Sequence, residues 1–193
     1  NLDRTLGAAK DDIGDSKVQV LAKYIGKSST LPGFICEPIE FSICENQGFK
    51  HALDCDVLFS CVDRPWPRLV LNTIAYGHLI PVIDGGIKVR TNESNSLLIG
   101  ADWKAHSVGP EKVCMECLGQ YSAGEAATEQ NGDFDDPAYI QGLPKKHFTK
   151  RSENVFAFSL GLAYMELQQF LSIVINPFRL SAPNQVYHFV TAT

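Results

Sequence analysis

Two short apolar runs in the middle of the chain predict two strands of a buried sheet. Val57 to Val62 and Leu79 to Ile83 lack the polar alternation of a half-exposed strand, which is typical of parallel strands that are covered on both faces. Asp63 follows the first run directly, and Asp84-Gly85-Gly86 ends the second. Because open α/β sheets bind ligands beyond the carboxyl ends of their strands, Asp63 is a candidate functional residue.

The segment between these two runs predicts a helix. Pro65 and Pro67 suit a helix start, with Pro67 at or near the first helical position, and the helix is expected to continue to Gly77. Its inner face is expected to consist of Val70, Thr73 and Ile74. Strand, helix and strand within about thirty residues form a βαβ unit, which is almost always right-handed.

Helical spacing marks one further helix near the start of the chain and a longer one near its end. The first has its apolar positions at Val18, Leu21, Ala22 and Ile25. Asp15 or Ser16 is expected to cap this helix and Gly26 to end it. Asn154 to Ile175, ended by Asn176-Pro177, has the most regular helical pattern in the chain. Its apolar stripe is expected to consist of Leu160, Ala163, Leu167, Phe170, Leu171 and Val174.

The remaining segments complete an α/β pattern. Phe34 to Ile43 predicts an extended segment that Pro38 interrupts, as in an edge strand or a bulge. Val89 to Ile99 predicts a strand or hairpin, and Gln185 to Val190 a last strand. Gly119 to Lys146 is polar and predicts a long surface excursion. We expect one domain over residues 1–193, with a mostly parallel sheet flanked by helices and with residues 119–150 as the excursion.

Composition and charge exclude several classes of function. The 193 residues suffice for one domain with its own core. Acidic residues outnumber basic ones by 22 to 17, for a net charge of -5, which argues against a nucleic-acid partner. The longest apolar stretch, Val155 to Tyr164, is too short and too polar to cross a bilayer, and no signal-peptide pattern opens the chain. We therefore expect neither a nucleic-acid nor a membrane partner.

The cysteines predict a reducing compartment and one possible metal site. Six cysteines are few for a secreted domain held by disulfides, so we expect mostly reduced thiols in a cytoplasmic protein. Cys114 and Cys117 form a CxxC pair, which is half of a structural zinc site. His106, His147 or His188 could complete such a site. A redox pair or two packed thiols are the alternatives.

Basic residues and Asp63 offer candidate chemistry that spacing alone does not decide. Arg4, Lys10, Lys17 and Arg68 are scattered, and solvated surface is the favoured interpretation of each taken singly. Lys17 differs because it starts a predicted helix, where a cation opposes the helix dipole unless an anion such as phosphate shares the site. Asp63 fits a loop carboxylate that binds backbone N–H groups as well as it fits a ligand of nucleotide-bound Mg²⁺.

Six segments follow one another along the chain in an informative order. They are Asn1-Leu2-Asp3-Arg4, Asp12 to Lys17, Asp56 to Asn72, Ile80 to Gly86, Val113 to Leu118 and Asn154 to Leu171. In this order and spacing they resemble the ThiF/MoeB/HesA family of ubiquitin-activating and sulfur-carrier-adenylating enzymes. The resemblance spans most of the chain and implies a Rossmann-like sheet of the ThiF type.

The resemblance also implies an activity. Family members bind MgATP and adenylate the C-terminal carboxylate of a ubiquitin-like or sulfur-carrier protein, releasing pyrophosphate. Carried over by position, Arg4 and Lys17 would hold phosphates, Asp63 would bind Mg²⁺, and Asn1 would line the nucleotide site. A homodimer is implied too, because family members commonly complete the ATP site with an arginine of the second subunit.

Some positions depart from the family pattern and leave alternatives open. Arg64 stands where the family usually has Asn. The Gly-rich ATP loop of the family would precede Asn1. The resemblance assigns Cys114 and Cys117 to the first half of the family's zinc site. Lys146 to Arg151 contains no cysteine, so adenylation without a thioester step at that position is expected. A non-catalytic partner of a heterodimeric enzyme is the alternative, and a nicotinamide dehydrogenase ranks last because no GxGxxG motif is present.

Overall fold

The computed structural model describes residues 6–92, 97–133, 155–175 and 184–190. Its contacts divide the chain into two compact units, residues 1–50 and residues 51–193. No helix among the described residues is both long enough and apolar enough to cross a bilayer.

The first unit contains a short 3-10 helix, η1 (Lys10–Asp12), and helix α1 (Lys17–Ser28). Ser16 occupies the N-cap position of α1, as predicted, and the buried Val20 is on its inner face. The helix continues through Gly26 to Ser28, two residues beyond the predicted end, because no left-handed residue stops it at Gly26. Phe34 to Ile43 forms no strand, so the expected edge strand is absent there. Helix α2 (Asn46–Leu53) spans the position where the two units divide.

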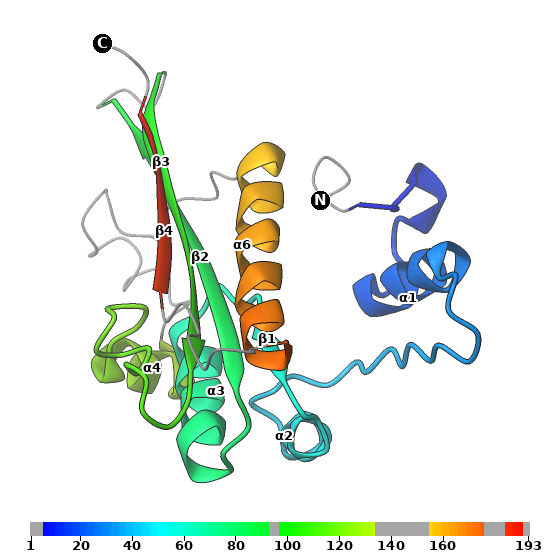
Figure 1. Cartoon of the computed structure of the whole chain (residues 1–193), viewed down its shortest axis with the longest axis horizontal. Helices are drawn as coiled ribbons and strands as arrows, with labels where there is room; N and C mark the ends of the chain where they lie inside the picture. Colours follow the sequence, from blue (N-terminus) through cyan, green and yellow to red (C-terminus); the bar gives the residue numbers. More distant parts are fainter. Residues whose placement is uncertain (1–5, 93–96, 134–154, 176–183, 191–193) are drawn as a thin grey trace. The chain divides into compact units, whose positions relative to one another are not determined.

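The described residues of the second unit form a four-stranded sheet with helices on both faces. Its elements are β1 (Leu58–Ser60), α3 (Pro65–Gly77), β2 (Val82–Thr91), β3 (Leu98–Val108), α4 (Ala123–Gln130), α6 (Phe156–Val174) and β4 (Asn184–Val190). The strand order is β1-β2-β3-β4, with β1 parallel to β2 and the other neighbours antiparallel. Helix α6 packs on one face, and α3 on the other beside α4 (Figure 1). The expected α/β fold is confirmed, as a mixed sheet.

Strand β2 is longer than the sequence indicates. The prediction that this strand ends at Asp84-Gly85-Gly86 is wrong, because the three residues lie inside β2 and pair with His106, Ala105 and Lys104 of β3. Both glycines are tolerated since the antiparallel partner continues the hydrogen-bond ladder past them. The expected hairpin over Val89 to Ile99 is confirmed, with residues 93–96 outside the described part of the chain.

Helix α3 follows the predicted bounds closely, and the predicted inner face in part, with Ile74 buried as expected. It begins at Pro65, which leaves Pro67 as its third residue, and ends at Gly77 as expected. The buried side chains of its middle are Leu71, Ile74 and Ala75. Thr73, expected on the inner face, is exposed and donates its hydroxyl hydrogen to the carbonyl of Leu69.

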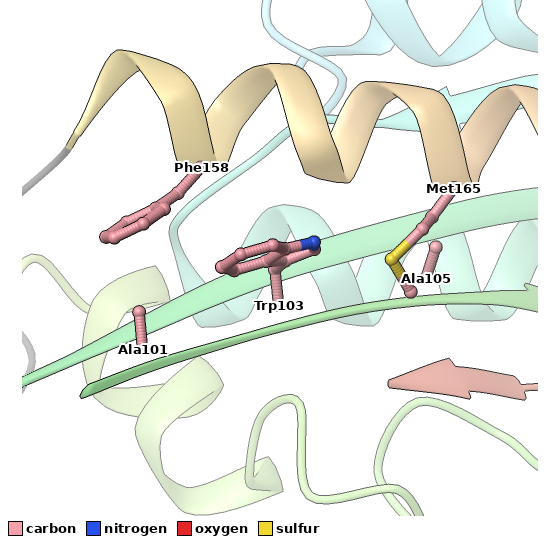
Figure 2. Packing of buried hydrophobic residues seen from close by; sticks show 5 residues of the cluster. All are labelled: Ala101, Trp103, Ala105, Phe158 and Met165. Carbon is pink, nitrogen blue, oxygen red and sulfur yellow. The ribbon is translucent and has the colours of Figure 1, made fainter. Parts of the chain in front are cut away.

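The core between α6 and the sheet is built around Trp103 of β3. Its cluster comprises Ala101, Trp103, Ala105, Phe158 and Met165 (Figure 2). The indole stacks on Phe158 of α6 with ring centroids 5.1 Å apart, and on Tyr187 of β4 at 4.4 Å. Alanines on either side of the indole along β3 leave room for it, so one large side chain joins helix α6 to strands β3 and β4.

Helix α6 faces the sheet with a different side from the one predicted. Its buried residues are Phe158, Met165, Glu166 and Gln169. Much of the expected stripe points away from the sheet, with Leu160 and Leu167 about half exposed (52% and 50%), whereas Phe170 packs on Phe59 of β1 with ring centroids 5.6 Å apart. The helix is apolar around nearly its whole circumference, so hydrophobic periodicity does not determine its rotation. The hydrogen bonds of the buried Gln169 with Ser107 and Gln185 help to do so instead.

Candidate functional site

Asp63 lies in the segment that leaves the carboxyl end of β1. Strand β1 ends at Ser60, helix α3 begins at Pro65, and the Asp63 side chain between them is exposed. Because β1 and β2 are parallel, this connection emerges at the edge of the sheet where α/β proteins bind their ligands. An exposed carboxylate at this edge can accept a hydrated cation or a backbone N–H group.

A row of buried polar side chains lies directly behind this segment. Ser60, Asp84 and His106 are register partners on three adjacent strands, and none of the three is accessible to solvent. The Ser60 hydroxyl donates a hydrogen bond of 2.5 Å to Asp84 Oδ1. His106 Nε2 lies 3.5 Å from the other carboxylate oxygen of Asp84. The row therefore centres on the carboxylate of Asp84.

Arg68 joins this row to two other parts of the unit. Its Nε lies 3.4 Å from Asp84 Oδ1, and its side chain is only 13% exposed. Its two terminal nitrogens donate to the carbonyls of Gly85, at 3.2 Å, and Gln120, at 2.9 Å. The interpretation of Arg68 as solvated surface is therefore wrong, because its guanidinium neutralises a buried carboxylate and binds two backbone carbonyls.

Burial dominates the electrostatics of the row. It raises the pKa of Asp84, against the opposing effects of Arg68, Ser60 and Lys104. It lowers the pKa of His106 to about 4, helped by the positive charges of Lys104 and Arg68, so this imidazole is neutral at pH 7. On the opposite face of the sheet, burial and the charge of Asp84 raise the pKa of Glu166 to about 7.

The other expected nucleotide-binding residues belong to the first unit. Lys17 is the first residue of α1 and is exposed, with Ser16 preceding it. Asn1 and Arg4 lie outside the described residues. Lys17 belongs to the first unit and Asp63 to the second.

The CxxC pair is close together, but it forms no complete metal site among the described residues. The Cys117 amide donates to Cys114 Sγ at 3.3 Å, and hydrogen bonding from Cys117 lowers the pKa of the Cys114 thiol. All six cysteines are free thiols. Within the described ranges, no three His, Cys, Asp or Glu side chains gather as metal ligands would. The expectation of zinc here stays a prediction.

Sequence reasoning missed the buried row behind Asp63. Ser60 lies inside the first apolar run, and Asp84 directly follows the second, where the predicted strand ends. One available signal was that each of the two apolar runs carries a polar residue near its carboxyl end. Parallel pairing brings such residues side by side, so Ser60 and Asp84 could have been matched.

A mixed α/β sheet with helices on both faces defines an α/β domain, and the exposed Asp63 lies just beyond a parallel strand, where domains of this class commonly bind their ligands. The sequence model of the ThiF family matches residues 1–143, and the chain belongs to this family. ThiF proteins are adenylyltransferases related to the activating enzymes of ubiquitin-like proteins, and they generally bind ATP and Mg²⁺. No curated protein matches the chain significantly.

Proposed function

We propose that this chain activates the C-terminal carboxylate of a ubiquitin-like or sulfur-carrier protein as an acyl-adenylate, at the expense of MgATP. The observation that carries the proposal is the place of Asp63, exposed beyond the carboxyl end of β1 within the range that the ThiF family matches. A carboxylate in that place is suited to a nucleotide-bound cation.

The adenylation reaction requires neutralisation of negative charge more than it requires proton transfer. A carboxylate oxygen of the acceptor attacks the α-phosphorus of ATP, an O–P bond forms, and the bond to the β-phosphate breaks to release pyrophosphate. The attacking carboxylate is already ionised at neutral pH, so no general base is required. The site must instead hold several negative groups together in line, which fixed cations and precise positioning achieve.

Asp63 is the residue that would hold magnesium. Mg²⁺ prefers hard oxygen ligands and commonly takes one or two protein carboxylates together with substrate phosphates and water. One exposed carboxylate fits that demand without a protein-only cage. Bound there, the ion would offset the charge of the phosphates, and Asp63 would fix its place relative to the sheet.

Lys17, Arg4 and Asn1 would complete the nucleotide site. Lys17 is an exposed cation in the first turn of α1, where the helix dipole already favours an anion. A phosphate that binds both the helix start and the ammonium group would relieve the repulsion between them. Arg4 would add a second cation, and Asn1 a polar contact to the nucleotide.

Calorimetric titration of MgATP into the purified chain tests the proposal, followed by ATP–pyrophosphate exchange with candidate acceptors. Asp63→Asn and Lys17→Ala should each weaken MgATP binding by tenfold or more, on the order of 1.4 kcal/mol. Asp56→Asn and Lys23→Ala are matched controls, since both residues are exposed and lie near the tested ones, before β1 and on α1. Loss of binding in the controls, or full binding in the tested variants, would contradict the assignment.

The same titration distinguishes the second candidate function. A non-catalytic partner of a heterodimeric activating enzyme would keep the fold and bind no MgATP. Sedimentation of the wild type, alone and with nucleotide, tests the proposed homodimer. Metal analysis of the chain, with Cys114→Ser for comparison, tests whether Cys114 and Cys117 contribute to a zinc site.

A further inference from the structure

We propose that Asp84 is a positioning residue for Asp63, because its buried carboxylate holds both ends of the segment that carries Asp63. The inference rests on the proposed function in one respect, that Asp63 binds nucleotide-bound magnesium. The interactions of Asp84 with the residues on either side of this segment, called ties below, are a property of the fold and can be tested without nucleotide.

The two ties enclose the segment Cys61 to Arg64. On one side, Ser60 is the last residue of β1 and donates its hydroxyl hydrogen to Asp84 Oδ1 at 2.5 Å. On the other side, Arg68 in the first turns of α3 places its Nε 3.4 Å from the same oxygen. Asp63 thus lies three residues after one tie and five residues before the other.

Backbone pairing alone gives this end of β1 little support. The strand is three residues long, and its pairing with β2 ends at Ser60 opposite Asp84. The side-chain bond from Ser60 therefore acts at the last rung of the ladder, where strands otherwise fray. A completely buried carboxylate is costly unless it is paired, and Arg68 and Ser60 offset part of the cost of its burial.

The surroundings of Asp84 leave it no route to a ligand of its own. Its side chain has no solvent exposure, and His106 Nε2 stands 3.5 Å from its second oxygen. Lys104 on β3 contributes positive charge from the same face, and Glu166 contributes negative charge from the other face. Asp84 consequently acts on the site only through the segment that it holds.

Magnesium binding is sensitive to such indirect support. Residues that orient a metal ligand without touching the metal typically change its affinity by about 10- to 100-fold when they are replaced. Asp84→Asn keeps the shape of the side chain and an acceptor for Ser60, but removes the charge that attracts Arg68. Ser60→Ala removes the other tie and leaves the Asp84–Arg68 pair in place.

The experiment compares local hydrogen exchange with magnesium dependence in the full chain. In both variants, amide exchange over Cys61 to Arg64 should rise more than exchange in β3. At fixed ATP, the Mg²⁺ concentration needed for half-maximal nucleotide binding should increase about tenfold. Asp102→Asn is the matched control, because Asp102 is on the same face of β3 as His106. It pairs with Arg90 and His188 and not with Arg68 or Ser60. It should leave both readouts unchanged.

Each remaining outcome has a definite meaning. Unchanged exchange over Cys61 to Arg64 in Ser60→Ala would overturn the proposal, as would an unchanged magnesium dependence in the presence of faster exchange. A uniform rise in exchange across β1, β2 and β3 would overturn it as well, since it would make Asp84 a determinant of global stability alone. If the wild type binds no MgATP, the proposed function fails, and the exchange data still decide whether Asp84 holds the segment.

Discussion

The carboxyl group of Glu166 in helix α6 lies directly over Gly85 in strand β2. A Cβ atom placed on Gly85 would collide with Glu166 Oε1 and would come within 2.9 Å of Leu162 Cδ1. Gly85 is buried, and the side chain of Glu166 is only 7% exposed. The missing side chain at this position is what allows α6 to approach the sheet with a polar residue.

Gly85→Ala should therefore destabilise the second unit by about 1–3 kcal/mol, because the added methyl overpacks the contact with α6. Gly124→Ala is the control, since a Cβ there meets nothing within 4 Å and α4 gains a better helix former. Chemical denaturation followed by circular dichroism measures both. Equal stability of the two variants would show that α6 does not press on β2 at Gly85.

Glu166→Gln should stabilise the protein at alkaline pH and leave it almost unchanged in acid. The pKa of Glu166 is about 7 in the folded chain against 4.5 normally, so the folded state favours the protonated form. The stability that this preference contributes is complete below pH 4.5 and is lost as the pH rises through 7, by about 3 kcal/mol.

Denaturant titrations at pH 5 and pH 8.5 would test this, with Glu111→Gln as a control at an exposed carboxylate. A constant difference between Glu166→Gln and the wild type at both pH values would contradict the assigned pKa.

His106 should give the opposite dependence on pH. Its pKa is about 4 in the folded chain against 6.5 normally, so its contribution is complete above pH 6.5 and is lost as the pH falls through 4. The loss amounts to about 3 kcal/mol, and it would partly offset the gain from Glu166 in the wild type. The effect is best measured in the Glu166→Gln background, where His106→Gln should flatten the acid side of the profile. A profile unaltered by His106→Gln would mean that another group titrates.

Two substitutions on α6 test which side of that helix faces the sheet. Met165→Ala should cost about 2–5 kcal/mol, because Met165 is 8% exposed and packs in the Trp103 cluster. Leu167→Ala should cost less than about 1 kcal/mol, because Leu167 is 50% exposed. The sequence pattern alone predicts the reverse order. Thermal unfolding of the two variants side by side decides between them.

The parts of the fold that sequence could predict are those where one local signal dominates. Proline fixes φ and removes an N–H group, and α3 accordingly starts at the prolines after Asp63. Strand β1 lies within the apolar run before Asp63, and it pairs parallel to β2 as expected. The exposed position of Asp63 beyond that strand followed from these two facts.

The parts that sequence could not predict depend on partners distant in the chain. The two glycines after Asp84 look like a strand end, yet β3 extends the strand past them by antiparallel pairing. The residues around Arg68 do not indicate that its guanidinium pairs with Asp84, which lies 16 positions later in the chain. In α6, the contacts of Gln169 with Ser107 and Gln185 help set the rotation of a helix that is apolar all round.

The two tryptophans occupy places that make them separate optical probes. Trp103 is stacked between rings of α6 and β4, whereas Trp66 is in the first turn of α3, three residues after Asp63, where its amide binds Glu129. With Trp66→Phe, emission would report the melting of the packed interior; with Trp103→Phe, it would report events beside the connection after β1. Fluorescence could thus separate a ligand-induced rearrangement from unfolding in a single titration series.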